Sequence, residues 1–281
     1  MKSNIAAVVL AAVFALNACH AGAQGIDDRW TYALQPYVWL PGVKATLQYG
    51  PPPVGGNSPN MSMDTEKLLN AIDMAAMVSG EARKGRWLIG MDAMYLDFGH
   101  MDSRVASVDF NPGTGPVNVS TANLNAGGVT DLSGTLFTLT GGYAAVKDAR
   151  NSFDVIGGLR YFRMHAKTSW QLSAVVAGPG GSTAFARTGV VDKADDLWTG
   201  IIGVKGRSKL GASDWFVNYY VDIGSGGDST TTWQGIGGVG YAFKWGDLVL
   251  DYRALHYSVG GQKLIDELTA SGLSIGARFQ F

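Results

Sequence analysis

The strongest constraint on this chain is a period-two alternation of apolar and polar residues, which recurs in about ten segments. In the clearest segment Trp215, Val217, Tyr219, Val221 and Ile223 share one face, and Phe216, Asn218, Tyr220 and Asp222 share the other. Successive side chains of a strand point to opposite faces, so one face suits lipid while the other tolerates polar groups. Beyond the N-terminal region no apolar stretch is long enough for a membrane helix. The pattern predicts an all-β fold, a transmembrane antiparallel up-and-down barrel of about ten strands, with eight or twelve as alternatives.

The same alternation occurs at 87–95, 153–161 and 232–243. In the last of these segments Gly238 and Gly240 interleave with larger apolar residues. Small residues at inward positions let side chains of opposite walls meet inside a narrow barrel. We therefore expect a largely packed interior.

The connections between these segments alternate in length. Short turns are expected at 84–86, 148–151, 211–214 and 245–247, where Gly, Asn or Asp favour tight hairpins. Longer connections are expected at 50–71, 100–129 and 173–195, with shorter ones at 225–228 and 260–269. Outer-membrane barrels pair short periplasmic turns with longer external loops. We also expect short helices in the external loops, one capped by Asp64 and running to Ile72, the other at 262–268.

The N-terminus indicates export. Lys2 precedes an apolar run at 5–16, and Ala21 and Ala23 flank Gly22 as a small-residue cleavage site. We expect a signal peptide at 1–23, a barrel domain at 24–281 and a location in the cell outer membrane. As an alternative, residues 16–19 resemble a lipobox, which would place a lipid on Cys19. With cleavage after Ala23, the only cysteine would leave with the signal peptide.

Charged residues at inward positions are the most informative functional hint. They are Glu81, Asp92, Arg160, Lys205, Asp222, Asp251, Arg253 and Arg278, and their signs are mixed. One interpretation is that ion pairs hold the barrel wall together, and the other is that they line a narrow path for a small solute. The solute itself is not indicated by the sequence.

Aromatic residues near the strand ends predict two girdles at the membrane interfaces. One set lies near short turns or the chain ends: Trp30, Trp87, Phe153, Trp215, Phe243 and Phe279. The other lies toward the long connections: Trp39, Tyr95, Phe98, Tyr161 and Tyr257. The alternative is a soluble periplasmic lipocalin-like binder with these residues in its core.

Other chemistry is weakly indicated. The formal net charge of −1 and the scattered Lys and Arg argue against nucleic-acid binding. An outer-membrane lipid or peptide hydrolase could place His100, His165 and His256 with nearby aspartates at the rim, but no family-specific spacing accompanies them. Neither the carboxylates Asp192, Asp195 and Asp196 nor the glycine-rich run at 235–240 has the context of a metal or dinucleotide site. We expect no enzyme activity, no metal and no cofactor.

The last segment alternates strictly and ends on an aromatic residue. Its apolar positions are Leu273, Ile275, Ala277, Phe279 and Phe281. They resemble the C-terminal signature that outer-membrane barrels present to the barrel assembly machinery. The resemblance implies that this machinery is a partner during biogenesis.

The stretches at 35–42 and 68–98, with the hairpin at 82–87, look like a family of proteobacterial outer-membrane barrel proteins without assigned activity. This resemblance implies an outer-membrane barrel and supplies no catalytic residues. OmpW-like and OmpA-like barrels are similar in architecture only. The expected role is structural or that of a narrow channel, with outer-membrane lipid, lipopolysaccharide and external solutes as contacts.

Overall fold

The computed structural model describes residues 29–47, 60–63, 72–104, 120–178, 181–227, 229–260 and 265–281. These residues form eleven strands: β1 (Trp30–Leu47), β2 (Asn60–Met63), β3 (Ile72–Lys84), β4 (Trp87–Arg104), β5 (Ser120–Lys147), β6 (Asn151–Gly178), β7 (Gly181–Lys209), β8 (Trp215–Gly226), β9 (Thr231–Phe243), β10 (Gly246–Ser258) and β11 (Ile265–Gln280). The signal-peptide prediction at 1–23 lies outside the described residues.

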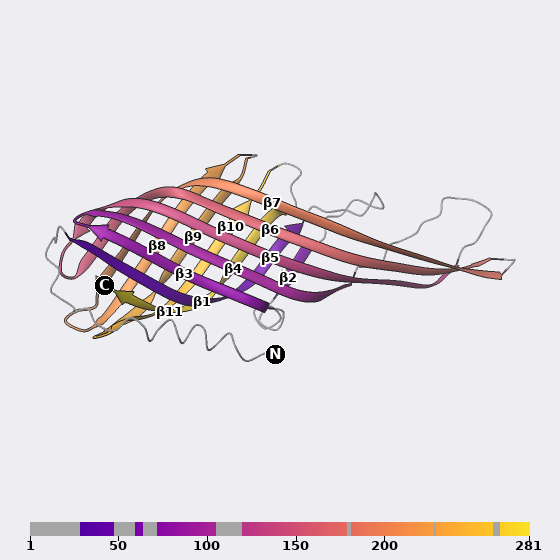
Figure 1. Cartoon of the computed structure of the whole chain (residues 1–281), viewed down its shortest axis with the longest axis horizontal. Helices are drawn as coiled ribbons and strands as arrows, with labels where there is room; N and C mark the ends of the chain where they lie inside the picture. Colours follow the sequence, from indigo (N-terminus) through magenta and orange to yellow (C-terminus); the bar gives the residue numbers. More distant parts are fainter. Residues whose placement is uncertain are drawn as a thin grey trace.

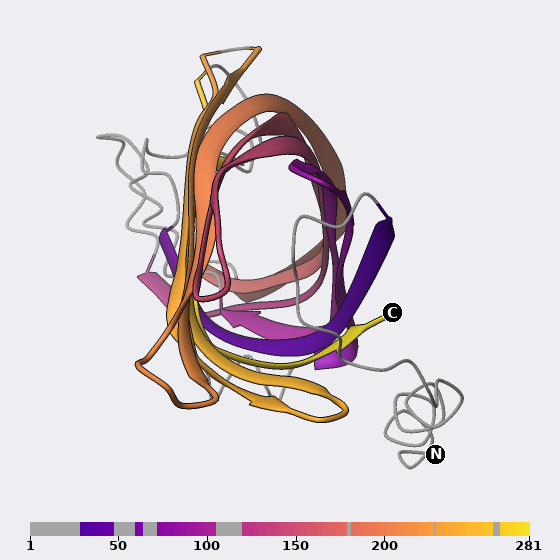
Figure 2. The same ribbon diagram turned by 90° about the vertical axis from the view of Figure 1, so that its left-hand side faces the viewer.

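The strands close into an antiparallel barrel (Figures 1 and 2). From β3 to β11 each strand pairs with the next in sequence, β3 pairs with β1, and β1 pairs with β11 to complete a ring of ten strands. At this seam the Tyr32 amide donates to the Phe281 carbonyl at 3.1 Å, and the Phe281 amide donates to the Tyr32 carbonyl at 2.9 Å. β2 lies beside the far part of β1, where Val43 is paired with Met63. The all-β barrel of about ten strands is confirmed.

Tight turns join the strands at one end of the barrel, as the sequence predicts. Gly85 adopts a φ of 60° in the two-residue turn between β3 and β4, a conformation that costs glycine no steric strain. In the turn between β5 and β6 the Asp148 carboxylate accepts the amides of Arg150 and Asn151, each at 2.7 Å. These two hydrogen bonds hold the pKa of Asp148 below its ordinary value, and the bond from Arg150 has the larger effect.

Long strands occupy much of the chain that we predicted to be external loop. β5, β6 and β7 contain 28, 28 and 29 residues and project beyond the other strands (Figure 1). The loop prediction at 173–195 is wrong, because β6 and β7 stay hydrogen bonded up to the pair Gly178 and Gly181. The 100–129 connection is likewise shorter than predicted, since β4 reaches Arg104 and β5 begins at Ser120.

The predicted helix at 262–268 is also contradicted, because residues from Ile265 on belong to β11. Leu268 is paired with Ala45 of β1 and with Tyr257 of β10, and pairing on both sides overrides a local helical tendency. The other predicted helix lies mostly at 64–71, outside the described residues. No helix among the described residues is long and apolar enough to cross a membrane.

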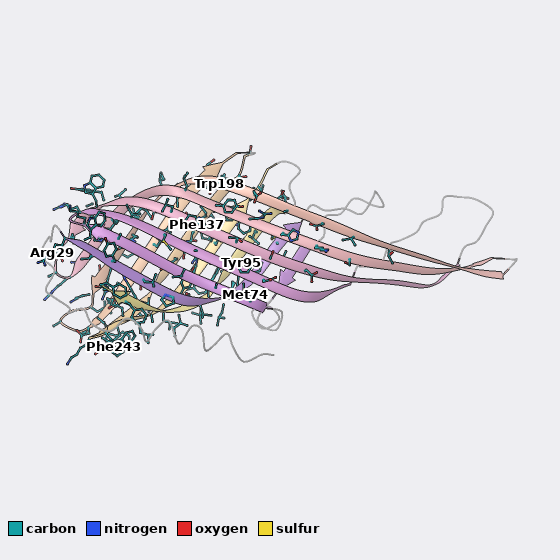
Figure 3. The ribbon with its side chains drawn as sticks, in the orientation of Figure 1. Arg29, Met74, Tyr95, Phe137, Trp198 and Phe243 are labelled. Carbon is teal, nitrogen blue, oxygen red and sulfur yellow. The ribbon has the colours of Figure 1, made fainter. Side chains whose placement is uncertain are left out.

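The outer wall is apolar and the interior is polar over much of its length. The most exposed wall residues include Ile202 at 66 % and Ile223 at 61 %, whereas Arg160 and Asp222 on the inner side are at most 1 % exposed. The strand faces predicted at 215–223 are confirmed, because Trp215 is exposed and Phe216 is buried. Figure 3 shows side chains standing outward around the wall.

Of the six girdle residues predicted at the turn end, Trp30, Trp87, Trp215 and Phe243 are exposed, and Phe153 and Phe279 are partly exposed. Two residues of the opposite girdle are corrected, since Trp39 is only 3 % exposed and Tyr257 is fully buried inside the barrel. Their inward direction follows from strand parity, because the neighbouring Val38 is exposed. Trp198 and Trp233 are exposed instead.

Candidate functional site in the barrel interior

Side chains of strands that are not neighbours in the sheet meet inside the barrel. The predicted inward charges come from β3 (Glu81), β4 (Asp92), β6 (Arg160), β7 (Lys205), β8 (Asp222), β10 (Asp251 and Arg253) and β11 (Arg278). Their contacts link β3 to β7 and β4 to β10, and only the interior connects such strands. The structure therefore gathers these charges into cross-barrel networks.

Glu81 is the centre of the network near the turn end. It pairs with Lys205 of β7, with Arg278 Nη2 at 3.3 Å and with Arg83 Nη2 at 3.3 Å. Arg83 also donates from Nη1 and Nη2 to the two carboxylate oxygens of Asp154, at 3.0 and 2.7 Å. Such a bidentate pair is strong and directional. This layer ties β3, β6, β7 and β11 together.

A second pair closes the opposite side of this layer. Arg207 of β7 donates to both carboxylate oxygens of Asp247 in β10. Its guanidinium lies 3.4 Å from the ring centroid of Phe216, which is 2 % exposed. The Phe216 ring lies over Gly240, where a Cβ would overlap it. The small residue on β9 thus makes room for the aromatic ring of β8.

The central layer contains the most deeply buried charges. Arg160 Nη2 donates to Asp222 Oδ2, and neither side chain is exposed. The same guanidinium donates from Nε to Thr138 at 3.2 Å and from Nη1 to Thr232 at 3.4 Å. These bonds compensate for removing a guanidinium from water.

Arg253 joins three other strands at a similar depth. Its Nη2 donates to Asp92 Oδ2 at 2.7 Å and to Gln234 Oε1 at 2.9 Å, and its Nη1 donates to the Tyr37 hydroxyl at 2.8 Å. Tyr37 in turn donates to Asp92 Oδ1 at 2.7 Å. The guanidinium carbon lies 5.1 Å from the Trp39 ring, a cation–π distance. Asp251 accepts a bond from Asn218 at 2.7 Å.

Several members of these networks were not predicted from the sequence. Arg83, Asp154, Arg207 and Asp247 were not among the predicted lumen charges, although Arg83 has the parity of Glu81 and Arg207 that of Lys205. Strict use of strand parity would have found them.

An apolar cluster fills the barrel on the side away from the short turns. Its buried members include Trp39, Met77, Met94, Leu132, Leu136, Phe162, Met164, Leu197, Leu255, Tyr257, Val259 and Leu268. The rings of Phe162 and Tyr257 stack with centroids 5.0 Å apart. The interior therefore passes from ion pairs to close-packed apolar side chains, and both parts bring opposite walls into contact.

The two described histidines of the enzyme alternative lie apart in the barrel. His165 contacts Asp192 at 2.7 Å between β6 and β7, while His256 of β10 contacts the Thr269 hydroxyl at 2.9 Å. The side chain of His100 lies outside the described residues. The geometry of these residues therefore does not bring His165 and His256 to one rim site.

The acidic residues considered as a metal site and the glycine-rich run considered as a dinucleotide site both lie within strands. Asp192, Asp195 and Asp196 lie in β7, where Asp196 contacts Tyr161 and Arg163. Among the described residues no group of three or more potential metal ligands occurs. The glycine-rich run at 235–240 lies within β9, and a turn and β10 follow it rather than a helix.

The five residues resembling an assembly signal lie in or next to β11. Leu273, Ile275 and Phe281 are exposed on the outer wall, and β11 is paired on both sides. They form one apolar row at the seam of the barrel. Their recognition by an assembly partner stays a prediction.

No protein-family model and no curated protein sequence matches the chain. Among solved structures it is similar to the outer membrane protease OmpT of Escherichia coli, at 12 % identity and a TM-score of 0.45, with 90 % of this chain and 97 % of that one covered. Ail, the attachment invasion locus protein of Yersinia pestis, gives 9 % identity and a TM-score of 0.31, with 89 % and 98 % covered. The toluene transporter TodX of P. putida gives 8 % identity and a TM-score of 0.26, with 90 % of each chain covered. At such TM-scores these likenesses assign neither activity nor ligand.

Proposed function

We propose that this chain is an integral outer-membrane protein whose closed barrel anchors an external three-stranded sheet. The observation that carries the proposal is the inversion of the barrel: exposed aliphatic side chains cover the wall, while Arg160, Asp222 and Arg253 are buried inside. A soluble lipocalin-like barrel would place its apolar residues inward and its charges in water. An apolar wall between aromatic girdles is the pattern of a barrel in lipid.

The lumen supports a closed barrel rather than a wide pore. Ion pairs cross it at two depths, and an apolar cluster follows on the far side. Seven of the eight predicted lumen charges form ion pairs, and Asp251 accepts a hydrogen bond from Asn218. The network therefore holds the wall together without presenting a path of one polarity. The role that fits this interior is structural rather than enzymatic.

The projecting part of β5, β6 and β7 offers the surface for external contacts. Where this part leaves the barrel, next to the end of β8, outward side chains form cross-strand pairs: the rings of Tyr161 and Trp198 lie 4.8 Å apart, and the Tyr161 hydroxyl donates to Asp196 at 2.6 Å. Arg163 and His165 add basic groups beside aspartates. A mixed aromatic and charged face suits contacts with lipopolysaccharide or solutes outside the cell.

The first experiment tests membrane insertion. Outer membranes from expressing cells are washed with carbonate, and gel migration is compared before and after boiling. We expect the protein to stay in the membrane and to migrate differently when unheated. Recovery in the soluble periplasmic fraction, without a heat-dependent shift, would overturn the proposal.

The second experiment tests closure. In a planar bilayer we expect wild type and Arg163→Ala, which changes only the external face, to give no discrete conductance. The double variant Asp92→Ala/Arg253→Ala removes both partners of a cross-barrel pair and should also give no discrete steps, because the Glu81 layer and the apolar cluster still cross the lumen. Discrete, ion-selective steps from wild type would favour the narrow channel instead. Retained heat-dependent migration confirms that each variant is folded.

A further inference from the structure

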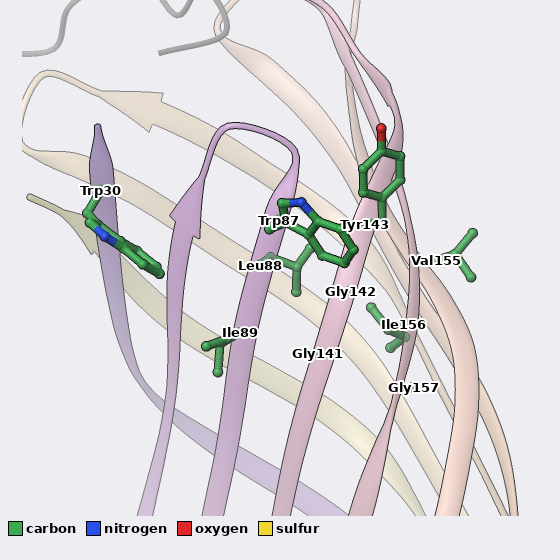
Figure 4. A pocket seen from close by; sticks show the side chains of 10 residues that line it. All are labelled: Trp30, Trp87, Leu88, Ile89, Gly141, Gly142, Tyr143, Val155, Ile156 and Gly157. Carbon is green, nitrogen blue, oxygen red and sulfur yellow. The ribbon is translucent and has the colours of Figure 1, made fainter. Parts of the chain in front are cut away.

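The outer wall carries a notch near the turn end, and it is lined almost wholly by apolar groups. The notch encloses about 540 Å³ between β1, β4, β5 and β6 (Figure 4). Its floor is formed by Gly141 and Gly157, which are directly paired between β5 and β6. A Cβ at Gly141 would meet nothing within 4 Å, so the notch is open space on the outside of the wall.

Larger side chains surround this floor. Trp87 and Tyr143 stand at the turn side with ring centroids 5.1 Å apart, and Trp87 is 68 % exposed. Ile89 and Val155 flank the glycines and are half exposed. Figure 4 shows these residues around the two glycines. This apolar lining suits contact with a hydrocarbon chain.

A second hollow continues the notch toward the turn between β3 and β4. It shares Trp30, Trp87 and Tyr143 with the notch and adds Lys84, Gly85 and Arg86. Arg86 is positioned by a hydrogen bond from Nη1 to the Ala144 carbonyl at 3.4 Å. The apolar notch, an aromatic collar and two cations thus follow one another toward the membrane surface.

We propose that this surface binds one glycerophospholipid with an anionic headgroup, from the leaflet next to the short turns. An acyl chain occupies the notch over Gly141 and Gly157, and the phosphate group lies against Lys84 and Arg86. The charge complementarity selects an anionic lipid, because a cation near the membrane surface favours such headgroups. This inference rests on the proposed membrane location.

Two variants separate the apolar contact from the charge contact. Gly141→Leu places a side chain in the notch, at a position where its Cβ meets nothing within 4 Å. Gly237→Leu is its control, because Gly237 is an exposed glycine of β9 with nothing within 4 Å of its Cβ position. Lys84→Gln/Arg86→Gln removes the cations. Lys244→Gln is its control, because Lys244 is an exposed cation in the turn between β9 and β10.

Native mass spectrometry of the delipidated full chain measures binding of phosphatidylglycerol and of phosphatidylcholine with the same acyl chains. For wild type we expect one tightly held lipid and a preference for phosphatidylglycerol of about tenfold. Lys84→Gln/Arg86→Gln should lose this preference. Gly141→Leu should weaken binding of both lipids about tenfold, as loss of the burial of about two methylene groups would. The controls should match wild type.

Equal binding of both lipids by wild type, or equal binding by Gly141→Leu and Gly237→Leu, would overturn the proposal and leave only a general lipid annulus. Heat-dependent migration is measured on every sample. A protein that shows the shift but no lipid preference retains the proposed function and refutes only the lipid site. A protein without the shift refutes the membrane location itself.

Discussion

Replacing Arg160 with methionine is expected to destabilise the barrel by about 3–5 kcal/mol, the cost of leaving a buried partner charge unpaired. This cost is that of breaking a buried ion pair rather than an exposed one, because neither Arg160 nor Asp222 has an exposed side chain. Water therefore does not screen their interaction. The variant also loses the bonds to Thr138 and Thr232. The double variant Arg160→Met/Asp222→Leu removes both charges. Its free energy of unfolding should be within about 1 kcal/mol of the wild-type value or higher.

The assay is reversible urea unfolding in lipid vesicles, followed by tryptophan fluorescence and by gel migration. The matched control is Arg163→Met on the same strand, whose pair with Asp196 spans 3.7 Å with both side chains about half exposed. That change should cost at most about 1 kcal/mol. If Arg160→Met costs less than about 1 kcal/mol, or if the double variant is as unstable as the single one, the ion pair does not hold the wall.

Three further changes test other parts of the structure. Gly240→Val should destabilise by about 1–3 kcal/mol because its side chain would overlap the Phe216 ring, whereas Gly237→Val, with open space around its Cβ, should be neutral in the same unfolding assay. Deleting Phe281 removes the two backbone bonds to Tyr32 at the seam and one exposed aromatic residue. We expect less heat-shifted protein in membranes, and unchanged assembly would contradict an assembly role. Because the pKa of Asp148 is lowered, its turn contributes stability above the ordinary aspartate pKa and loses it as pH falls through the lowered value. NMR titration should show this pKa below that of an unstructured peptide, and an unshifted value would refute the turn geometry.

Local alternation was sufficient to predict the strand at 215–223 and the side of the wall that its residues face. Trp215, Val221 and Ile223 are exposed, and Phe216 and Asp222 are buried, as their parity requires. Partners across the lumen could not be predicted, because the contact of Arg253 with Asp92 depends on the registers of every intervening strand pair.

The aromatic residues show where hydropathy alone fails. Trp39 and Tyr257 were assigned to a girdle because large rings at strand ends prefer the membrane interface. Parity instead directs them into the barrel, where the far half of the interior is apolar and accepts them. The strands at 173–195 were missed because this segment is rich in glycine and its alternation of apolar and polar residues is weak. Only the pairing of β6 with β7 identifies them.

The projecting sheet leaves one long border of β7 without a neighbour in the described structure. β8 begins to pair with β7 only at Thr199, whereas β6 pairs with β7 back to Gly181. A border of this kind presents backbone groups to which another strand can add, including the same strand of a second copy. Asp192, Asp195 and Asp196 lie on that border. Joining two copies along this border would bring the carboxylates of one copy near those of the other, and like charges close together disfavour such edge-to-edge pairing.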